Sequence, residues 1–132
     1  MMTLRAETAR ELMTPGPYSL ADTDTVEQAA AFLTDRGFGA AVVIDEAGHP
    51  LGVVTKTDLL IHVRERAAGK KVEPATAREV MTPAVFSVRE ETPARSVVEQ
   101  LVALNVHHLF VTDRTGVVVG VISPFDVVKK LA

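Results

Sequence analysis

The 132-residue sequence contains no cysteine and no tryptophan, and only one tyrosine and five phenylalanines. Without cysteine, disulfide bonds, thiolate metal sites and cysteine nucleophiles are excluded. A hydrophobic content of 47% with 23% charged residues is that of an ordinary soluble globular protein, and its core must be largely aliphatic. The length predicts one compact domain or two small, interdependent halves.

An excess of positive charge is also missing, since the formal net charge is −3. We therefore expect no nucleic-acid partner and no attraction to an anionic membrane. No apolar run approaches the length of a membrane span. The first 13 residues carry charges and no apolar core, so they do not form a signal peptide, and we expect a cytoplasmic location.

Catalytic motifs are absent as well. The sequence has no Gly-x-Ser-x-Gly elbow, no P-loop and no His-Glu-x-x-His, so we expect no enzyme and no cofactor. The adjacent His107 and His108 would point to opposite faces of a strand, and His49 and His62 lie in a turn and on a helix. No chelating spacing results, and we expect no metal site. One of these histidines could instead face a phosphate.

An internal repeat organises the chain. Met13-Thr14-Pro15 recurs as Met81-Thr82-Pro83, an offset of 81 − 13 = 68 residues. At this offset residues 9–60 align with 77–128 without a gap, and 14 of the 52 pairs are identical. Roughly three identities would be expected by chance from average residue usage. The sequence is therefore a duplication.

Each half predicts the same order of elements, read from apolar periodicity and from turn and cap residues. In the first half these are a short helix at 8–13, an extended piece at 18–20, a helix from Val26 to Gly37, strands at 40–45 and 50–55, and a helix at 56–68. In the second half they are 76–81, 86–88, Ala94 to Asn105, 108–113, 117–123 and 124–131. Asp45 and Asp113 precede tight turns and are expected to form them.

The predicted fold class is α/β (α+β), with two repeats of β-α-β-β-α packed face to face about a pseudo-twofold axis. The first domain covers residues 8–68, a charged linker covers 69–75, and the second domain covers 76–132. Each unit leaves helices that cannot bury their apolar faces alone. We therefore expect the two halves to depend on each other.

Two matching segments stand where a strand runs into a helix: Thr55-Lys56-Thr57-Asp58 and Ser123-Pro124-Phe125-Asp126. Backbone N–H groups and the dipole at a helix start suit an anion such as phosphate. An Asp on the first turn can also accept both hydroxyl hydrogens of a ribose diol. The plainer interpretation is a capping box, with Pro124 at the first helical position. The occurrence of two copies favours the binding site.

This pattern resembles a tandem pair of CBS domains, often called a Bateman module. The resemblance covers residues 8–131 and is carried by the two Met-Thr-Pro segments, by Asn105-Val106-His107-His108-Leu109-Phe110-Val111-Thr112-Asp113, and by the two Thr/Ser-x-x-Asp segments. It implies a regulatory module, here standing alone, that binds an adenosyl ligand (AMP, ADP, ATP or S-adenosylmethionine) and controls an unknown partner protein in trans. The alternative is a structural, self-associating module whose clefts bind nothing.

The resemblance also implies two ligand clefts between the repeats. One would be lined by Thr55, Lys56, Asp58, Thr82, Val85, Phe86, His107 and His108. The other would be lined by Ser123, Asp126, Thr14, Pro17, Tyr18, Gly39 and Ala40. The first has Lys56 and histidines, and the second no cation, so we expect phosphates to be held at Asp58, and adenosine-like ligands or none at Asp126.

Related modules commonly pair through their closing helices, and we expect a homodimer. The apolar residues predicted to mediate it are Leu59, Leu60, Val63, Val127, Val128 and Leu131.

Overall fold

In the computed structural model, the Met-Thr-Pro segment of each repeat forms backbone pairing with a strand of the other repeat. The structure describes residues 1–16, 18–69 and 75–132. The chain forms two compact units. The Asp126 unit consists of residues 1–17 and 86–132, and the Asp58 unit consists of residues 18–85. The compact units thus differ from the sequence repeats, because the first segment of each repeat belongs to the unit that holds most of the other repeat. Face-to-face packing of the halves stays a prediction.

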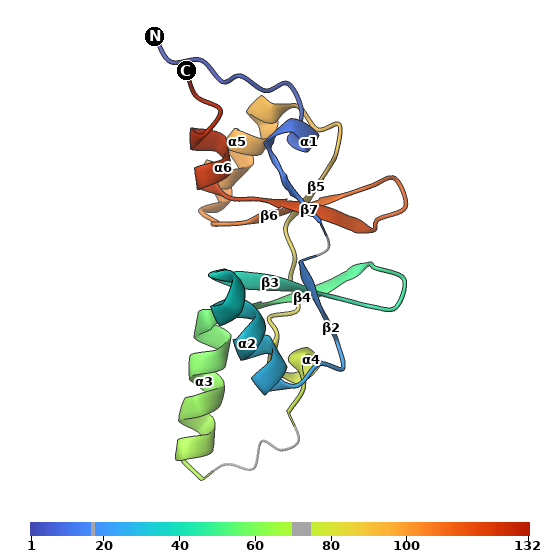
Figure 1. The fold of residues 1–132 in the computed structure, drawn as a ribbon, viewed down its shortest axis with the longest axis vertical. Helices are drawn as coiled ribbons and strands as arrows, with labels where there is room; N and C mark the ends of the chain where they lie inside the picture. The colour runs from blue at the N-terminus through green and yellow to red at the C-terminus, as the bar shows by residue number, and fades with distance from the viewer. Residues whose placement is uncertain (17, 70–74) are drawn as a thin grey trace. The chain divides into compact units, whose positions relative to one another are not determined.

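The Asp58 unit is built on a three-stranded sheet in the order β2-β3-β4. Its strands are β2 (Ser19–Ala21), β3 (Ala40–Ile44) and β4 (Pro50–Thr55), with β2 parallel and β4 antiparallel to β3. Helices α2 (Val26–Arg36) and α3 (Lys56–Ala67) lie side by side, and the short α4 (Ala77–Val80) packs against both (Figure 1). The core is aliphatic and consists of Leu20, Ala29, Leu33, Ala41, Val43, Val54 and Ala77.

The Asp126 unit has a four-stranded sheet in the order β1-β7-β6-β5. Its elements are α1 (Ala9–Leu12), β1 (Thr14–Pro15), β5 (Ser87–Arg89), α5 (Ala94–Leu104), β6 (Leu109–Thr112), β7 (Val118–Ile122) and α6 (Pro124–Val128). Strand β6 is parallel to β5 and antiparallel to β7. The core consists of Ala9, Leu12, Val88, Ala94, Val97, Leu101, Leu109, Val111, Ile122 and Val127.

Local sequence signals set the helix ends. Thr25 and Gln28 form a reciprocal capping box at the start of α2, and Gly37 ends that helix in the left-handed conformation, with φ 66°. Asn105 has the same role after α5, with φ 53°. Pro93 is the N-cap of α5 and offers no side-chain hydrogen bond. Ala68 is the C-cap of α3, and Gly69, with φ 80°, follows it. Positions 70–74 of the predicted linker lie outside the described residues.

The turn aspartates were predicted correctly. Asp45 Oδ1 accepts hydrogens from the backbone N–H groups of Ala47 and His49. Asp113 Oδ1 accepts from the backbone N–H groups of Thr115 and Val117. These donors lower the pKa of both carboxyls, with the His49 N–H as the main cause at Asp45 and the Thr115 hydroxyl at Asp113. Both residues therefore act as turn formers.

The last helix is shorter than predicted, ending at Val128 rather than Leu131. Leu131 instead forms an antiparallel bridge with Leu4, and the backbones of Thr3 and Ala132 exchange two hydrogen bonds. The backbone at the C-terminus therefore forms its hydrogen bonds with the N-terminal segment and not within a continued helix. Among the described residues, no helix is both long and apolar enough to cross a membrane.

Candidate functional site

The Asp58 carboxylate is held in place by residues from both repeats. Thr55 and Asp58 form a capping box, in which the Thr55 N–H and hydroxyl donate to Asp58 Oδ2 over 2.8 and 3.0 Å. The Thr82 hydroxyl donates to the other oxygen, Oδ1, over 3.1 Å. The capping-box interpretation is therefore confirmed, and the same hydrogen bonds orient the Asp58 carboxylate. Ligand binding by this carboxylate stays a prediction.

Backbone pairing places Thr82 beside Asp58. Thr82 and Val53 form an isolated antiparallel bridge, with 2.9 Å hydrogen bonds in both directions. The neighbouring Gly52 allows this close approach, because a Cβ there would lie 2.6 Å from the Thr82 carbonyl oxygen and 2.6 Å from Met81 Sδ. A glycine is therefore needed on β4 to bring the Thr-Pro segment to the carboxylate.

Lys56, Gly39 and Ala40 lie next to the Asp58 motif in the same unit. The Lys56 N–H donates to the Gly39 carbonyl over 3.2 Å, and Ala40 is paired with Thr55 across β3 and β4. A Cβ on Gly39 would be 3.7 Å from Lys56 Cε. The expectation that Gly39 and Ala40 line the cleft of Asp126 stays a prediction.

The Asp126 carboxylate repeats this arrangement in the other unit. Ser123 donates from its N–H and its hydroxyl to Asp126 Oδ2 over 2.8 and 3.0 Å. The Thr14 hydroxyl donates to Oδ1 over 3.0 Å. Strand β1 positions Thr14 through its antiparallel pairing with β7, and Gly120 allows the approach, since a Cβ there would be 2.9 Å from the Thr14 carbonyl oxygen.

The Asp126 carboxylate has a fourth neighbour, a lysine, in addition to the Ser123 N–H, the Ser123 hydroxyl and the Thr14 hydroxyl. Lys129 Nζ lies 3.3 Å from Asp126 Oδ1, and it also lies over the Phe125 ring, 5.4 Å from its centroid. The expectation of no cation on the Asp126 side is therefore wrong. The lysine follows the aspartate by three positions on a helical segment, a spacing that brings side chains together and could have revealed the pair.

His107 and His108 belong to the Asp126 unit. His107 is exposed, while His108 is half-buried with its ring stacked on Phe110, 6.5 Å between centroids. Burial lowers the pKa of His108, the charge of His107 lowers it further, and Asp126 partly offsets both. The histidine that senses the Asp126 carboxylate is therefore His108. That His107 or His108 lines the Asp58 cleft stays a prediction.

An aromatic cluster surrounds Tyr18, another predicted ligand residue. The Tyr18 ring meets Phe38 edge-on at 5.5 Å, and the Arg36 guanidinium lies over both Tyr18 and Phe32, at 5.1 and 5.0 Å from the ring centroids. Sequence reasoning missed Arg36, which ends α2 and whose counterpart in the second repeat is Leu104. Tyr18 is therefore a partly exposed ring with a cation stacked on it.

The remaining three predicted ligand residues are Val85, Phe86 and Pro17. Val85 is half-buried in the Asp58 unit, and Phe86 in the Asp126 unit has an exposed side chain while its carbonyl accepts from the Phe110 N–H. Pro17 lies outside the described residues. The structure thus brings Thr55 and Thr82 to Asp58, and Ser123 and Thr14 to Asp126, whereas ligand binding at all these positions stays a prediction.

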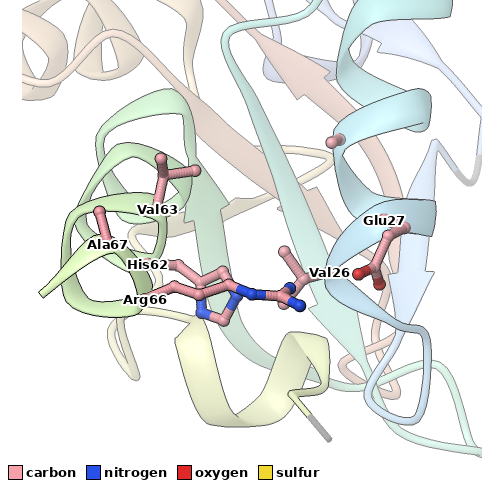
Figure 2. A pocket seen from close by; sticks show the side chains of 7 residues that line it. Val26, Glu27, His62, Val63, Arg66 and Ala67 are labelled. Atoms are coloured by element: carbon pink, nitrogen blue, oxygen red, sulfur yellow. The ribbon is translucent and has the colours of Figure 1, made fainter. Parts of the chain in front are cut away.

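A shallow groove of about 450 Å³ runs between α2 and α3 (Figure 2). His62 and Arg66 reach from α3 toward α2, as Figure 2 shows.

Of the residues expected to pair two chains, Leu60, Val63 and Val128 are exposed. Val127 is buried in the core and Leu59 packs against the core of the Asp58 unit, so they do not extend the exposed surface. The groove is lined by Val26, Glu27, Ala30, His62, Val63, Arg66 and Ala67.

Known proteins share this repeat and fold. Protein MJ1004 of Methanocaldococcus jannaschii is 32% identical over 125 residues, a match covering 93% of this chain and 56% of that protein. Its crystal structure has a TM-score of 0.80 at 29% identity, covering 92% of this chain and 58% of that one. Protein MK0525 of Methanopyrus kandleri is 27% identical over 120 residues, covering 91% of this chain and 58% of that protein. The chain thus spans just over half the length of both relatives.

A crystal structure of CBSX2 in complex with AMP has a TM-score of 0.80 at 23% identity, covering 94% of this chain and 95% of that chain. This likeness shows the fold. The family model of the CBS domain matches twice, at residues 9–65 and 77–132, one match for each repeat found in the sequence. The chain therefore belongs to the CBS-domain family and carries a tandem pair of these domains.

Proposed function

We propose that this CBS pair binds an adenosyl ligand, with the ribose diol on the Asp58 carboxylate, and uses the bound state to regulate a partner protein in trans. The observation that carries the proposal is the orientation of Asp58. Among the described residues three donors hold its two oxygens, two on Oδ2 and one on Oδ1. An ionised carboxylate has about four acceptor positions, so one position on Oδ1 is left for a ligand hydroxyl.

The likeness to CBSX2, which was crystallised with AMP, supports an adenine nucleotide as the ligand. The Asp58 side also offers more to a phosphate than the Asp126 side does. Helix α3 has 12 residues and begins with Lys56, whereas α6 has five and begins with Pro124. A longer helix presents the fuller dipole at its start, and the lysine adds a point charge. The phosphate is therefore expected near Lys56.

A homodimer is the second part of the proposal. Leu60 and Val63 are exposed on α3, and Val63 lines the groove between α2 and α3. The groove is lined mainly by aliphatic groups, with Arg66 and Glu27 as charged neighbours. A symmetric second copy would offer the same apolar strip together with the opposite charge to each of these residues. The regulatory surface would then include both chains.

The competing hypothesis is a structural module that self-associates but binds no ligand. A thermal-shift screen with AMP, ADP, ATP, S-adenosylmethionine and NAD separates the two. A ligand at 100 times its dissociation constant should stabilise the protein by about 2.7 kcal/mol. Stabilisation by one adenosyl ligand that is absent in Asp58→Ala supports the proposal. No stabilisation by any of the five ligands at millimolar concentration favours the structural module. That the chain is no enzyme, binds no metal and is cytoplasmic stays a prediction.

A further inference from the structure

The Asp126 carboxylate forms an ion pair with a lysine, and among the described residues its repeat counterpart Asp58 has no such ion pair. Lys129 Nζ lies 3.3 Å from Asp126 Oδ1. Subtracting the repeat offset of 68 from 129 gives position 61, which is Ile61 in the first repeat. An isoleucine cannot donate a hydrogen bond. This difference in the cationic neighbour therefore comes from one pair of equivalent positions, Lys129 and Ile61.

With Lys129 in place, the acceptor positions of Asp126 are filled. Its two oxygens face four donor groups, namely the Ser123 N–H and hydroxyl, the Thr14 hydroxyl and the Lys129 ammonium. An ionised carboxylate has about four acceptor positions, so a diol that brings two hydroxyl hydrogens must displace two of the donors already present. At Asp58 the described residues supply three donors, so the same diol has to displace only one of them.

Lys129 is the donor that a ligand would displace first. Ser123 is fixed by the capping box and Thr14 by the pairing of β1 with β7. The Lys129 side chain is 54% exposed, whereas that of Asp126 is only 8% exposed. The Phe125 ring beneath the ammonium helps to keep the lysine over the carboxylate. Asp126 also influences His108, whose pKa is lowered below the ordinary histidine value, so its imidazole carries little positive charge at pH 7.

We propose that Lys129 competes with the ribose diol for Asp126, which makes the Asp126 site the weaker of the two for adenosyl ligands. The inference rests on the proposed function and names the residue that sets the difference between its sites. The lysine end of this ion pair is 54% exposed, so solvent weakens the pair, and removing the lysine should strengthen diol binding by about two- to fivefold.

The test uses adenosine, which has the diol but no phosphate for Lys129 to attract. Calorimetry is carried out on Asp58→Ala, so that the Asp126 site alone is measured, with Lys129→Met or Lys130→Met added. Methionine keeps an unbranched side chain of similar length and removes the charge. The expected result is a gain of about two- to fivefold in adenosine affinity for Lys129→Met and no change for Lys130→Met, which loses the same charge. With 2′-deoxyadenosine, which lacks one diol hydroxyl, the gain should shrink.

The reciprocal variant Ile61→Lys, made in the otherwise wild-type chain, guards against misfolding of the double variants. It places a lysine three residues after Asp58 and should weaken adenosine binding at that site by a similar factor. Equal affinity in Lys129→Met and Lys130→Met overturns the inference, as does weaker adenosine or AMP binding in Lys129→Met, which would mark the lysine as a ligand contact. No binding of adenosine or AMP to the wild type contradicts the proposed function itself.

Discussion

The Thr82 hydroxyl donates a hydrogen bond of 3.1 Å to Asp58 Oδ1, joining a residue of the second repeat to the motif of the first. Thr82→Val keeps the shape of the side chain and removes this donor. We expect the free energy of unfolding to fall by no more than about 1 kcal/mol, because Thr82 is exposed. AMP affinity should fall about fivefold or more, because the carboxylate loses its orientation. Calorimetry and urea denaturation measure the two effects.

Thr14→Val is the matched control, since Thr14 holds Asp126 in the same way at 3.0 Å. It should leave the tighter AMP site unchanged. If both variants bind AMP like the wild type, the hydroxyls only support the fold.

Gly52→Ala should destabilise the protein by about 1–3 kcal/mol. The added Cβ would stand 2.6 Å from the Thr82 carbonyl oxygen, so the Val53–Thr82 bridge must open or shift. Gly39→Ala is the control, because its nearest contact would be the flexible Lys56 side chain at 3.7 Å. Its free energy of unfolding should change by no more than about 0.5 kcal/mol. Urea denaturation midpoints compare the two, and equal midpoints would mean that the close approach at Gly52 is not required.

Stability should fall as the pH drops below about 6.5, the ordinary pKa of histidine. The folded-state pKa of His108 is lowered, mainly by burial. Between the unfolded and folded pKa values the unfolded chain binds more protons, so unfolding is favoured as pH falls, and below the folded pKa the loss is complete. Thermal unfolding between pH 7.5 and 5.5 measures the dependence.

His108→Gln should reduce the loss of stability over that range. His107→Gln should reduce it less, because the charge of His107 is only the second cause of the lowered pKa. A pH dependence identical in the wild type and in both variants would assign the loss to other groups.

Leu60→Glu and Val63→Glu should each shift the proposed homodimer toward monomer. Both side chains are exposed on α3, 67% and 62% respectively, and a buried carboxylate at an interface is strongly disfavoured. Ala47→Glu, in the exposed turn after β3, adds the same charge away from the helices. Light scattering at micromolar concentration reports the mass. A monomeric wild type, or a dimer in all three variants, contradicts the assignment of this face.

The sequence predicted the elements well because their signals are local. Apolar periodicity located α2 and α5, and Gly37 and Asn105 marked their ends through the left-handed conformation. The repeat also predicted that Asp58 and Asp126 occupy matching motifs, each in the first turn of a helix that follows a strand. The exchange of the Met-Thr-Pro segments between units depends on the resemblance to CBS pairs, because no local signal tells which β-strand Thr82 will join.

The side-chain partners were harder to predict. The sequence placed Lys129 inside a longer helix, whereas it is the C-cap of the five-residue α6. Its contact with Asp126 follows from the i,i+3 spacing, which the sequence analysis did not consider. Arg36 was missed although Phe32 precedes it by four positions on α2, a spacing that brings side chains together. Its other partner, Tyr18, comes from outside the helix and reaches it only in the folded unit. The shorter α6 was also missed, since the pairing of Leu131 with Leu4 is a contact between the chain ends.

Calorimetric titration of AMP into the wild type, Asp58→Ala and Asp126→Ala tests the central claim most directly. Either substitution removes part of a capping box and should cost about 0.5–2 kcal/mol of stability, leaving both variants folded. We predict that Asp126→Ala binds AMP nearly as tightly as the wild type, and that Asp58→Ala loses most of the affinity. The opposite ranking, or wild-type affinity in both folded variants, would contradict the assignment of the ligand to Asp58.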